Sequence, residues 1–298
     1  MEIRTDLAHE MRERAVKKAK YHGKEIDGVI YSDSEKNGIR TSRIEITNAN
    51  GEKELRRERG SYVTVFFGDL LSCGGREFSA VCDAAAAEIR RMLTEKEIGA
   101  PLLVCGVGNS GITPDSVGPR TVSSVVVTHA LKKNRPELYV KLGLGDVSCI
   151  APGVTAQTGI EAAEIVRGAA DACGAAAVIA VDALCASDIT RLGRTVQLSS
   201  TGISPGSGIG GHGEEISART VGRRVIGIGV PTIADVMTAA GYDDTASVPE
   251  KERELWQGLF ICPQDIDRLA GKLALLCAYS INKAVNPDMT YEEMAELL

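Results

Sequence analysis

The sequence lacks several features that would place it in a specialised class of protein. Only 4% of its 298 residues are aromatic, and no run of about eighteen apolar residues is free of charge, so no membrane span is expected. Acidic residues outnumber basic ones by 40 to 34, whereas nucleic-acid binding calls for a basic surface. The 32 glycines follow no fixed period, which excludes a collagen-like chain. With 44% hydrophobic residues, the chain has enough apolar surface to fold.

The cysteines and histidines form no recognisable metal or redox motif. None of the eight cysteines belongs to a C-x-x-C pair, so zinc ribbons and redox motifs are unsupported. We expect reduced thiols that pack as small hydrophobic side chains. The four histidines have no spacing that places two of them on one helix face, so we expect no metal site and no cofactor. These histidines are His9, His22, His129 and His212.

The N-terminal region is charged and polar. Residues 1–30 lack the apolar core of a signal peptide, which together with the absence of a membrane span predicts a soluble intracellular protein. Residues 7–22 favour a helix with a solvated face. Residues 23–60 favour a small β-meander or hairpin, with turns at Asn37-Gly38 and Asn50-Gly51.

Apolar strands alternate with helices along most of the remaining chain. The predicted strands are 62–68, 101–107, 175–183, 195–198 and 224–230, and the predicted helices are 76–95, 117–133, 157–173 and 263–285. Such alternation is typical of an α/β fold, here a mostly parallel twisted sheet with helices on both faces. Residues 240–260 are polar and irregular, and we expect a surface loop or insertion there.

A glycine-containing loop, Gly106–Asp115, follows one of the predicted strands. It matches G-x-G-x-x-G, the dinucleotide fingerprint, but a Thr-Pro pair delays the helix. About twenty residues later Lys132 and Lys133 stand where an acid should bind the ribose, so the context disfavours a dinucleotide. Asp115 ends the loop near the carboxyl end of a strand, where α/β sheets bind ligands. A helix N-cap is its other possible role.

Asp182 follows a continuous apolar strand, Ala175–Val181. A carboxylate in this position is costly unless it is paired or used, so either an arginine partner or a functional role is expected. If its strand neighbours the one before Asp115, the two carboxylates lie at the same edge of the sheet. Carboxylates brought close together push their pKa values apart, which suits the activation of a water molecule.

A third segment, Leu198–Gly211, is dense in glycine and serine. Gly202–Gly206 matches G-x-S-x-G, the nucleophile elbow of serine hydrolases. Pro205 follows the serine where an elbow needs a helix, and the last histidine, His212, comes only eight residues after that serine. Backbone amides of the loop are suited instead to binding an extended substrate or an oxyanion. A plain flexible loop is the remaining interpretation.

Matches to one known family run in order along nearly the whole chain. They are Arg4–Ala8, Gly28–Ser34, Gly38–Thr47, Gly106–Asn109, Thr113–Pro119, Pro152–Val154, Thr158–Glu161, Ala180–Leu184, Thr201–Gly208, Gly229–Thr232 and Pro263–Asp267. These segments resemble the germination proteases of spore-forming bacteria, which degrade small acid-soluble spore proteins. So many matches in order are far more specific than any single motif above.

The resemblance implies an atypical aspartic-type endopeptidase with a fold similar to that of the hydrogenase-maturation peptidases. The family's two catalytic carboxylates correspond to Asp115 and Asp182. Its glycine loop implies substrate-binding residues, namely Gly202, Pro205, Gly206, Ser207 and Gly208. We expect the aspartates to share one proton and to hold a nucleophilic water, without a covalent intermediate. Which of them carries the proton stays open, because coupled groups titrate as a pair.

The resemblance also implies a self-processing zymogen and a homotetramer that acts in the cytoplasm of the forespore or spore core. Its substrates, the small acid-soluble spore proteins, are cut between an acidic and a following hydrophobic residue, in a context like Thr-Glu-Phe-Ala-x-Glu. Thr5–Glu10 has this pattern, so we expect processing between Asp6 and Leu7. The chain would then consist of a short pro-segment, residues 1–6, and a single peptidase domain, residues 7–298. We expect no direct nucleic-acid or membrane partner.

Three other functions stay open. One is a nickel-dependent hydrogenase-maturation-type peptidase, whose carboxylates would bind the metal of a client protein with help from a histidine. Another is a non-catalytic protein that binds a phosphate or nucleotide in its glycine loops, although G-x-x-x-x-G-K-[S/T] is absent. A serine hydrolase built on the G-x-S-x-G match is the third.

Overall fold

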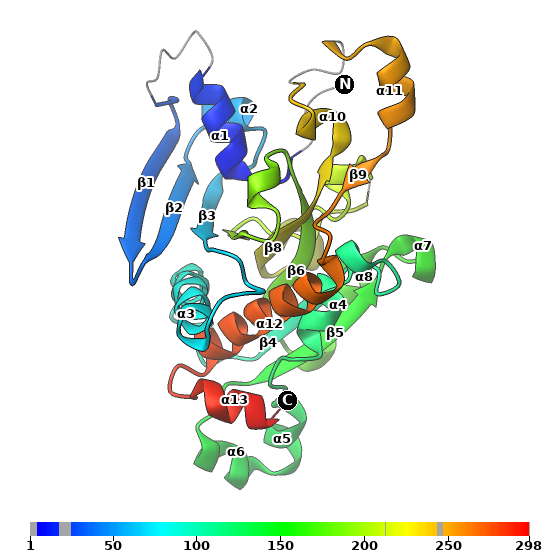
Figure 1. Cartoon of the computed structure of the whole chain (residues 1–298). Coiled ribbons are helices and arrows are strands. Elements are labelled where there is room, and N and C mark those ends of the chain that lie inside the picture. Colours follow the sequence, from blue (N-terminus) through cyan, green and yellow to red (C-terminus); the bar gives the residue numbers. More distant parts are fainter. Residues whose placement is uncertain (1–4, 18–24, 212, 243–246, 298) are drawn as a thin grey trace.

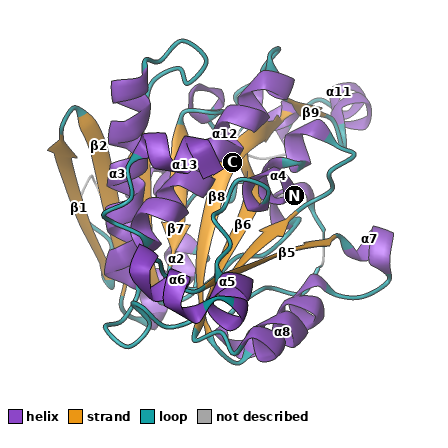
Figure 2. Ribbon diagram, turned by 90° about the horizontal axis from the view of Figure 1, so that it is seen from below, coloured by secondary structure: helices purple, strands orange, loops and turns teal. Residues whose placement is uncertain are grey.

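The computed structural model describes residues 5–17, 25–211, 213–242 and 247–297 (Figure 1). Within these ranges nine strands form one sheet in the order β1-β2-β3-β7-β8-β6-β4-β5, with β9 paired to β8. The strands are β1 (Val29–Lys36), β2 (Ile39–Ile46), β3 (Gly60–Phe66), β4 (Leu102–Val107), β5 (Val147–Gly153), β6 (Ala177–Ala186), β7 (Thr195–Ser199), β8 (Arg224–Asp235) and β9 (Phe260–Ile261). Figure 2 shows β1 near one edge of this sheet and β5 near the other.

The helices lie between and beyond these strands. They are α1 (Ala8–Lys17), α2 (Ala49–Leu55), α3 (Gly75–Met92), α4 (Val117–Val122), α5 (His129–Asn134), α6 (Pro136–Leu142), α7 (Thr155–Thr158), α8 (Ala162–Cys173), α9 (Ala218–Val221), α10 (Val236–Ala239), α11 (Glu250–Trp256), α12 (Ile266–Val285) and α13 (Tyr291–Leu297). In Figure 1, α5, α6 and α13 lie at the end of the molecule opposite α10 and α11. None of the described helices combines the length and apolarity needed to cross a membrane.

Parallel pairing holds the centre of the sheet together. β8, β6, β4 and β5 pair in parallel, whereas β7, β3, β2 and β1 extend the sheet by antiparallel pairing. The predicted N-terminal β elements therefore join the central sheet. Asn37 and Gly38, both with positive φ, make the tight turn that joins β1 to β2.

Helices cover both faces of the sheet because the side chains of β6 are apolar on both sides. Ile179 and Val181 belong to the core cluster that includes α3, α4 and α12, whereas Val178 and Ala180 belong to the cluster that includes α8 and α9. All four side chains are fully buried. The predicted α/β class, with helices on both faces, is confirmed.

Three local predictions differ from the structure. The turn expected at Asn50-Gly51 is the first turn of α2, because the Asn48 side chain accepts the N–H groups of both residues, at 2.9 and 3.0 Å. The helix predicted over 117–133 is divided into α4 and α5. Asn282 of α12 binds the chain between them, accepting the Val126 N–H at 2.9 Å and donating to the Ser124 carbonyl at 3.1 Å. The helix predicted over 157–173 is interrupted at Gly159, whose φ of 72° ends α7.

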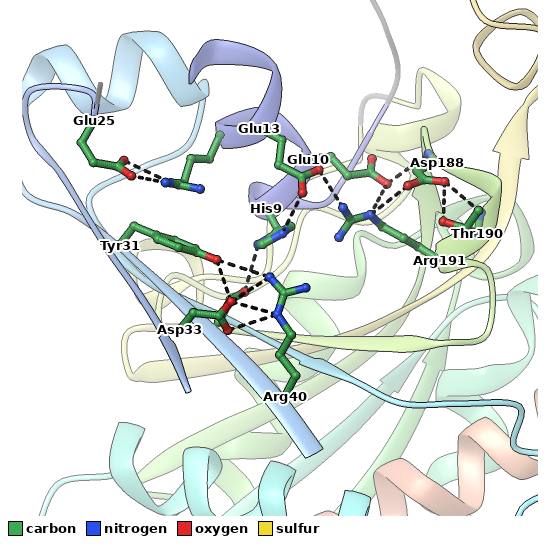
Figure 3. A network of polar contacts seen from close by, with 12 residues as sticks. His9, Glu10, Glu13, Glu25, Tyr31, Asp33, Arg40, Asp188, Thr190 and Arg191 are labelled. Carbon is green, nitrogen blue, oxygen red and sulfur yellow. Dashed lines mark hydrogen bonds and ion pairs between the residues drawn. The ribbon is translucent and has the colours of Figure 1, made fainter. Parts of the chain in front are cut away.

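The N-terminal helix is partly buried over Ala8–Lys17, so the predicted solvated face is wrong there, and residues 18–22 of the predicted helix lie outside the described residues. Ala8, His9, Glu10 and Ala15 of α1 are each at most 2% exposed. Figure 3 shows Glu10 and Glu13 directed at Arg191, which follows β6. Glu10, Arg12 and Glu13 of this helix are paired with charged residues outside it, so these charges do not mark a surface exposed to water.

The segment predicted as a surface loop, 240–260, contains α11 and leads into β9. Residues 243–246 lie outside the described residues. No residue of α11 is buried, and Leu255 is 62% exposed. β9 then pairs with the end of β8, through Ala234 and Ile261. This part of the chain therefore borders the carboxyl end of a central strand.

Candidate active site

Asp115 lies in the turn between β4 and α4. Its Oδ2 accepts the main-chain N–H of Asn109 at 2.7 Å, which folds the loop back on itself. A Cβ on Gly108 would come within 2.1 Å of the Asp115 carbonyl oxygen, and one on Gly106 within 2.0 Å of the Gly118 carbonyl oxygen. The glycines of the G-x-G-x-x-G match therefore allow close packing between the loop and α4.

Asp182 lies within β6 and is 4% exposed. The structure gives its carboxylate one hydrogen bond within the described residues, from the Ala183 N–H at 2.9 Å. Burial raises the pKa of Asp182 well above its ordinary value, and the negative charges of Asp115 and Asp6 raise it further. Burial also raises the pKa of Asp115, while the Asn109 N–H opposes that rise. Desolvation thus favours retention of a proton at this pair.

The topology brings the two aspartates together. β4 and β6 are parallel neighbours, and their pairing ends at Gly106 and Val181. Asp182 is the next residue of β6, and the loop that carries Asp115 begins where β4 ends. Both side chains line one cavity of about 300 Å³. They therefore share the sheet edge at which open α/β folds bind ligands.

The cavity is apolar apart from a few polar groups. Its apolar side chains are Ile112, Pro114, Leu184, Ile209, Ile233 and Phe260. Gly206 and Gly208 of the glycine loop also line it. Such walls exclude water and strengthen electrostatic interactions inside.

A second hollow of about 140 Å³ adjoins the first and shares Asp6, Leu184 and Ser204 with it. Gly202 and Ser207 line this second hollow, whereas Pro205 is among the lining residues of neither. Its other lining residues include Arg56, Arg57, Tyr62, Gln197, Gly227 and Gly229. The two hollows therefore adjoin, and we call them together the groove, with Asp115 and Asp182 lining its larger part.

The predicted processing site lies in this groove. The Asp6 N–H donates to the Cys185 carbonyl at 2.9 Å, and the Asp6 carboxylate accepts from the Cys185 N–H at 2.9 Å. Ser207 donates to the same carboxylate at 2.7 Å. Leu7 is fully buried. The bond between Asp6 and Leu7 therefore lies beside the cavity that holds the aspartate pair.

Sequence reasoning missed Gln197 and Cys185. Gln197 is 7% exposed and stands in a short buried strand, β7, where nothing in the sequence sets it apart. Its register partner is Gly229, which is also the partner of Asp182 on the other side. Side chains of register partners lie on the same face of a sheet, so Gln197 and Asp182 flank Gly229 on one face.

The remaining candidate residues are engaged elsewhere or lie outside the described residues. His9 contacts Ser42 and Glu13, and His129 contacts Asp146, while His22 and His212 are not described. Within the described ranges, no group of three or more His, Cys, Asp or Glu side chains is placed to hold a metal ion. Ser204 precedes a single 3-10 turn, Ser207–Ile209, and not the helix of a nucleophile elbow.

Comparisons with known proteins show the family to which the chain belongs. The profile of the germination protease family matches residues 6–248. The germination protease of Caldanaerobacter subterraneus subsp. tengcongensis is 36% identical over 99% of this chain and 98% of that protein. The one from Clostridium perfringens strain SM101 is 31% identical over 99% of both.

A solved structure of a NiFe hydrogenase maturation protease from Thermococcus kodakarensis aligns with a TM-score of 0.34 and 19% identity. The alignment covers 61% of this chain and 92% of that one. By the family profile and the full-length relatives, the chain belongs to the germination protease family.

Proposed function

We propose that this germination protease uses Asp115 and Asp182 as an aspartic-type catalytic pair to hydrolyse small acid-soluble spore proteins. The observation that carries the proposal is the placement of both carboxylates in one largely apolar cavity, with both pKa values raised. Asp182 is the more deeply buried of the two, at 4% exposed, and burial disfavours the ionised form of a carboxyl group. Asp182 is therefore assigned the shared proton, and Asp115 is assigned the role of base.

The reaction follows from these protonation states. Asp115 takes a proton from a water molecule as its oxygen attacks the peptide carbonyl carbon, while Asp182 gives its proton to the carbonyl oxygen. In the second step the C–N bond breaks, the proton on Asp115 passes to the leaving nitrogen, and the diol returns a proton to Asp182. Each aspartate regains its starting state, and no covalent enzyme intermediate forms.

The proposal extends to self-processing between Asp6 and Leu7. Its support is that Asp6 lines the cavity with the aspartate pair and that its own charge contributes to the raised pKa of Asp182. A zymogen, a homotetramer and action in the spore core are further parts of the proposal, drawn from the family. The homotetramer is tested by sedimentation velocity on the purified protein.

The direct test is the cleavage of a short peptide containing Thr-Glu-Phe-Ala-Ser-Glu, with products identified by mass spectrometry. The expected result is a single cut after the first Glu, lost in both Asp115→Asn and Asp182→Asn. Asp188→Asn is the matched control, because that carboxylate lies outside the cavity and binds the Thr190 N–H at 2.9 Å. If the wild type is silent, removing residues 1–6 tests whether the groove is blocked. Retained cleavage in either pair variant contradicts the mechanism.

A further inference from the structure

Residues 5–7 run without regular secondary structure up to helix α1, and Asp6 lines both hollows of the groove. The main chain of Asp6 pairs with Cys185 beyond the point where β4 stops pairing with β6. The Thr5 carbonyl accepts from Arg57 at 2.9 Å. An extended peptide held by main-chain hydrogen bonds at a strand end is a recurring mode of recognition. The contacts of these residues therefore indicate which groups of the protein recognise a substrate.

The Asp6 carboxylate is bound in a pocket that matches it in size and in hydrogen-bond donors. Its two carboxylate oxygens accept from two neutral donors, the Cys185 N–H at 2.9 Å and the Ser207 hydroxyl at 2.7 Å. A Cβ on Gly208 would come within 2.2 Å of Asp6 Oδ2 and within 2.5 Å of the Cys185 Cβ. Only glycine at this position leaves room for the carboxylate.

A different group holds the main chain on both sides of the Asp6–Leu7 bond. The Gln197 Nε2 donates to the Asp6 carbonyl at 2.9 Å, and the Gln197 Oε1 accepts the Ala8 N–H at 2.7 Å. The second contact fixes the orientation of the amide, so that its donor end faces the carbonyl. A donor at the carbonyl that water attacks stabilises the negative charge that develops on its oxygen.

Glu10, in helix α1, fixes the position of the Thr5–Glu10 segment from its C-terminal end. The Glu10 carboxylate accepts from the main-chain N–H groups of Ser187 and Asp188, at 2.8 and 3.1 Å. Figure 3 shows Glu10 beside Asp188 and Arg191. Both acidic residues of the Thr-Asp-Leu-Ala-His-Glu segment thus have their own donors, four residues apart.

We propose that Ser207 and the Cys185 N–H form the subsite for the acidic side chain before the cleaved bond, and that Gln197 aligns and polarises that bond. The proposal rests on the proposed endopeptidase function. The substrate class is a peptide with Asp or Glu at this position. An uncharged amide side chain fits poorly, because its NH₂ group would face one of the two donors.

The test measures kcat/KM of the full-length protein on two peptides that differ only in Glu or Gln before the bond. The wild type is expected to prefer the Glu peptide by about tenfold to a hundredfold, the range for a charge-assisted hydrogen bond. Ser207→Ala is expected to bring that preference close to unity by slowing only the Glu peptide. Gln197→Met is expected to slow both peptides by about a hundredfold, mainly in kcat, and to leave the preference intact.

Ser72→Ala is the matched control, since the Ser72 hydroxyl also donates to a carboxylate, Asp69, at 3.0 Å, but outside the groove. It is expected to change neither rate. An unchanged preference in Ser207→Ala would overturn the subsite, and full kcat in Gln197→Met would overturn the alignment role, while the endopeptidase proposal stood. A wild type that cleaves neither peptide, with or without residues 1–6, would overturn both proposals.

Discussion

Two regions of the molecule each bury a carboxylate but treat it in opposite ways. Asp182, in the groove, has one N–H donor and no cation within the described residues, and its pKa is raised. Glu13, on α1, is half-buried beside His9 and Arg191. The hydrogen bond from His9, with the charge of Arg191, lowers its pKa from 4.5 to about 2 despite the opposing effect of burial.

Carboxylates that stabilise the fold thus differ from those that are available for catalysis. On α1, the hydrogen bond from His9 and the charge of Arg191 lower the pKa of Glu13, so folding favours its anion. Asp182 has a single N–H donor and no cation among the described residues, which favours a proton on its carboxyl group. A buried charge alone does not distinguish the two cases, whereas the count and kind of its partners do.

The largest expected effect is on catalysis. Asp182→Asn should lower kcat/KM by about 10²–10⁴, the usual contribution of general acid–base catalysis. Thermal unfolding should show an unchanged or more stable fold, because the variant removes a poorly solvated carboxylate. Glu13→Gln should keep near-wild-type activity in the same peptide assay. Equal losses of activity in Asp182→Asn and Glu13→Gln would contradict the difference between a catalytic and a structural carboxylate.

The next effect is on stability. Arg191 is 9% exposed and pairs with Glu13 at 2.7 Å and with Glu10 at 3.5 Å. Arg191→Met leaves the buried Glu10 without its cation and should lower the free energy of unfolding by about 3 kcal/mol in urea titrations. Arg219→Met, which breaks a pair between the exposed Arg219 and Glu215, should leave the free energy of unfolding nearly unchanged. Similar values for the two would show that the pairing of Arg191 with Glu10 and Glu13 is not structural.

The smallest effect is the pH dependence of stability, and its sign differs between the regions. Because the pKa of Glu13 is lowered on folding, its contribution is present above pH 4.5 and is lost as the pH falls toward 2. Solvent screening limits it to about 1 kcal/mol. The raised pKa of Asp182 has the opposite effect. As the pH rises above 3.8 the unfolded chain loses this proton while the folded protein retains it, so the stability of the fold decreases.

Unfolding curves between pH 3 and pH 7 measure both effects. Glu13→Gln should be less stable than the wild type near neutral pH, and this difference should shrink as the pH falls. Asp182→Asn should gain stability toward neutral pH. Differences from the wild type that do not vary with pH would contradict both assignments.

The sequence predicted the groove better than the N-terminal helix, for a physical reason. The apolar runs of β4 and β6 can be recognised in the sequence, and their parallel pairing brings Asp115, in the loop after β4, and Asp182, within β6, to one cavity. The residues of α1 are strongly charged, and charge suggested solvent. Their partners, such as Arg191, lie far away in the sequence, so no local pattern shows that they are paired.

The parts of the site that escaped prediction depend on tertiary contacts. The Gln197 side chain contacts Ala8 and Asp6, which are 189 and 191 residues away in the sequence. Cys185 contributes a main-chain N–H, which every residue except proline possesses. β5 was missed because Val147–Gly153 is only partly buried and shows no alternation of apolar and polar residues.

The most direct measurement follows the carboxyl ¹³C resonance of Asp182 through a pH titration, with Asp182→Asn to assign the signal. The account predicts a midpoint well above 3.8, which moves down in Asp115→Asn because the neighbouring negative charge is gone. A midpoint at or below 3.8, or one that is unchanged in Asp115→Asn, would contradict a proton shared by these two aspartates.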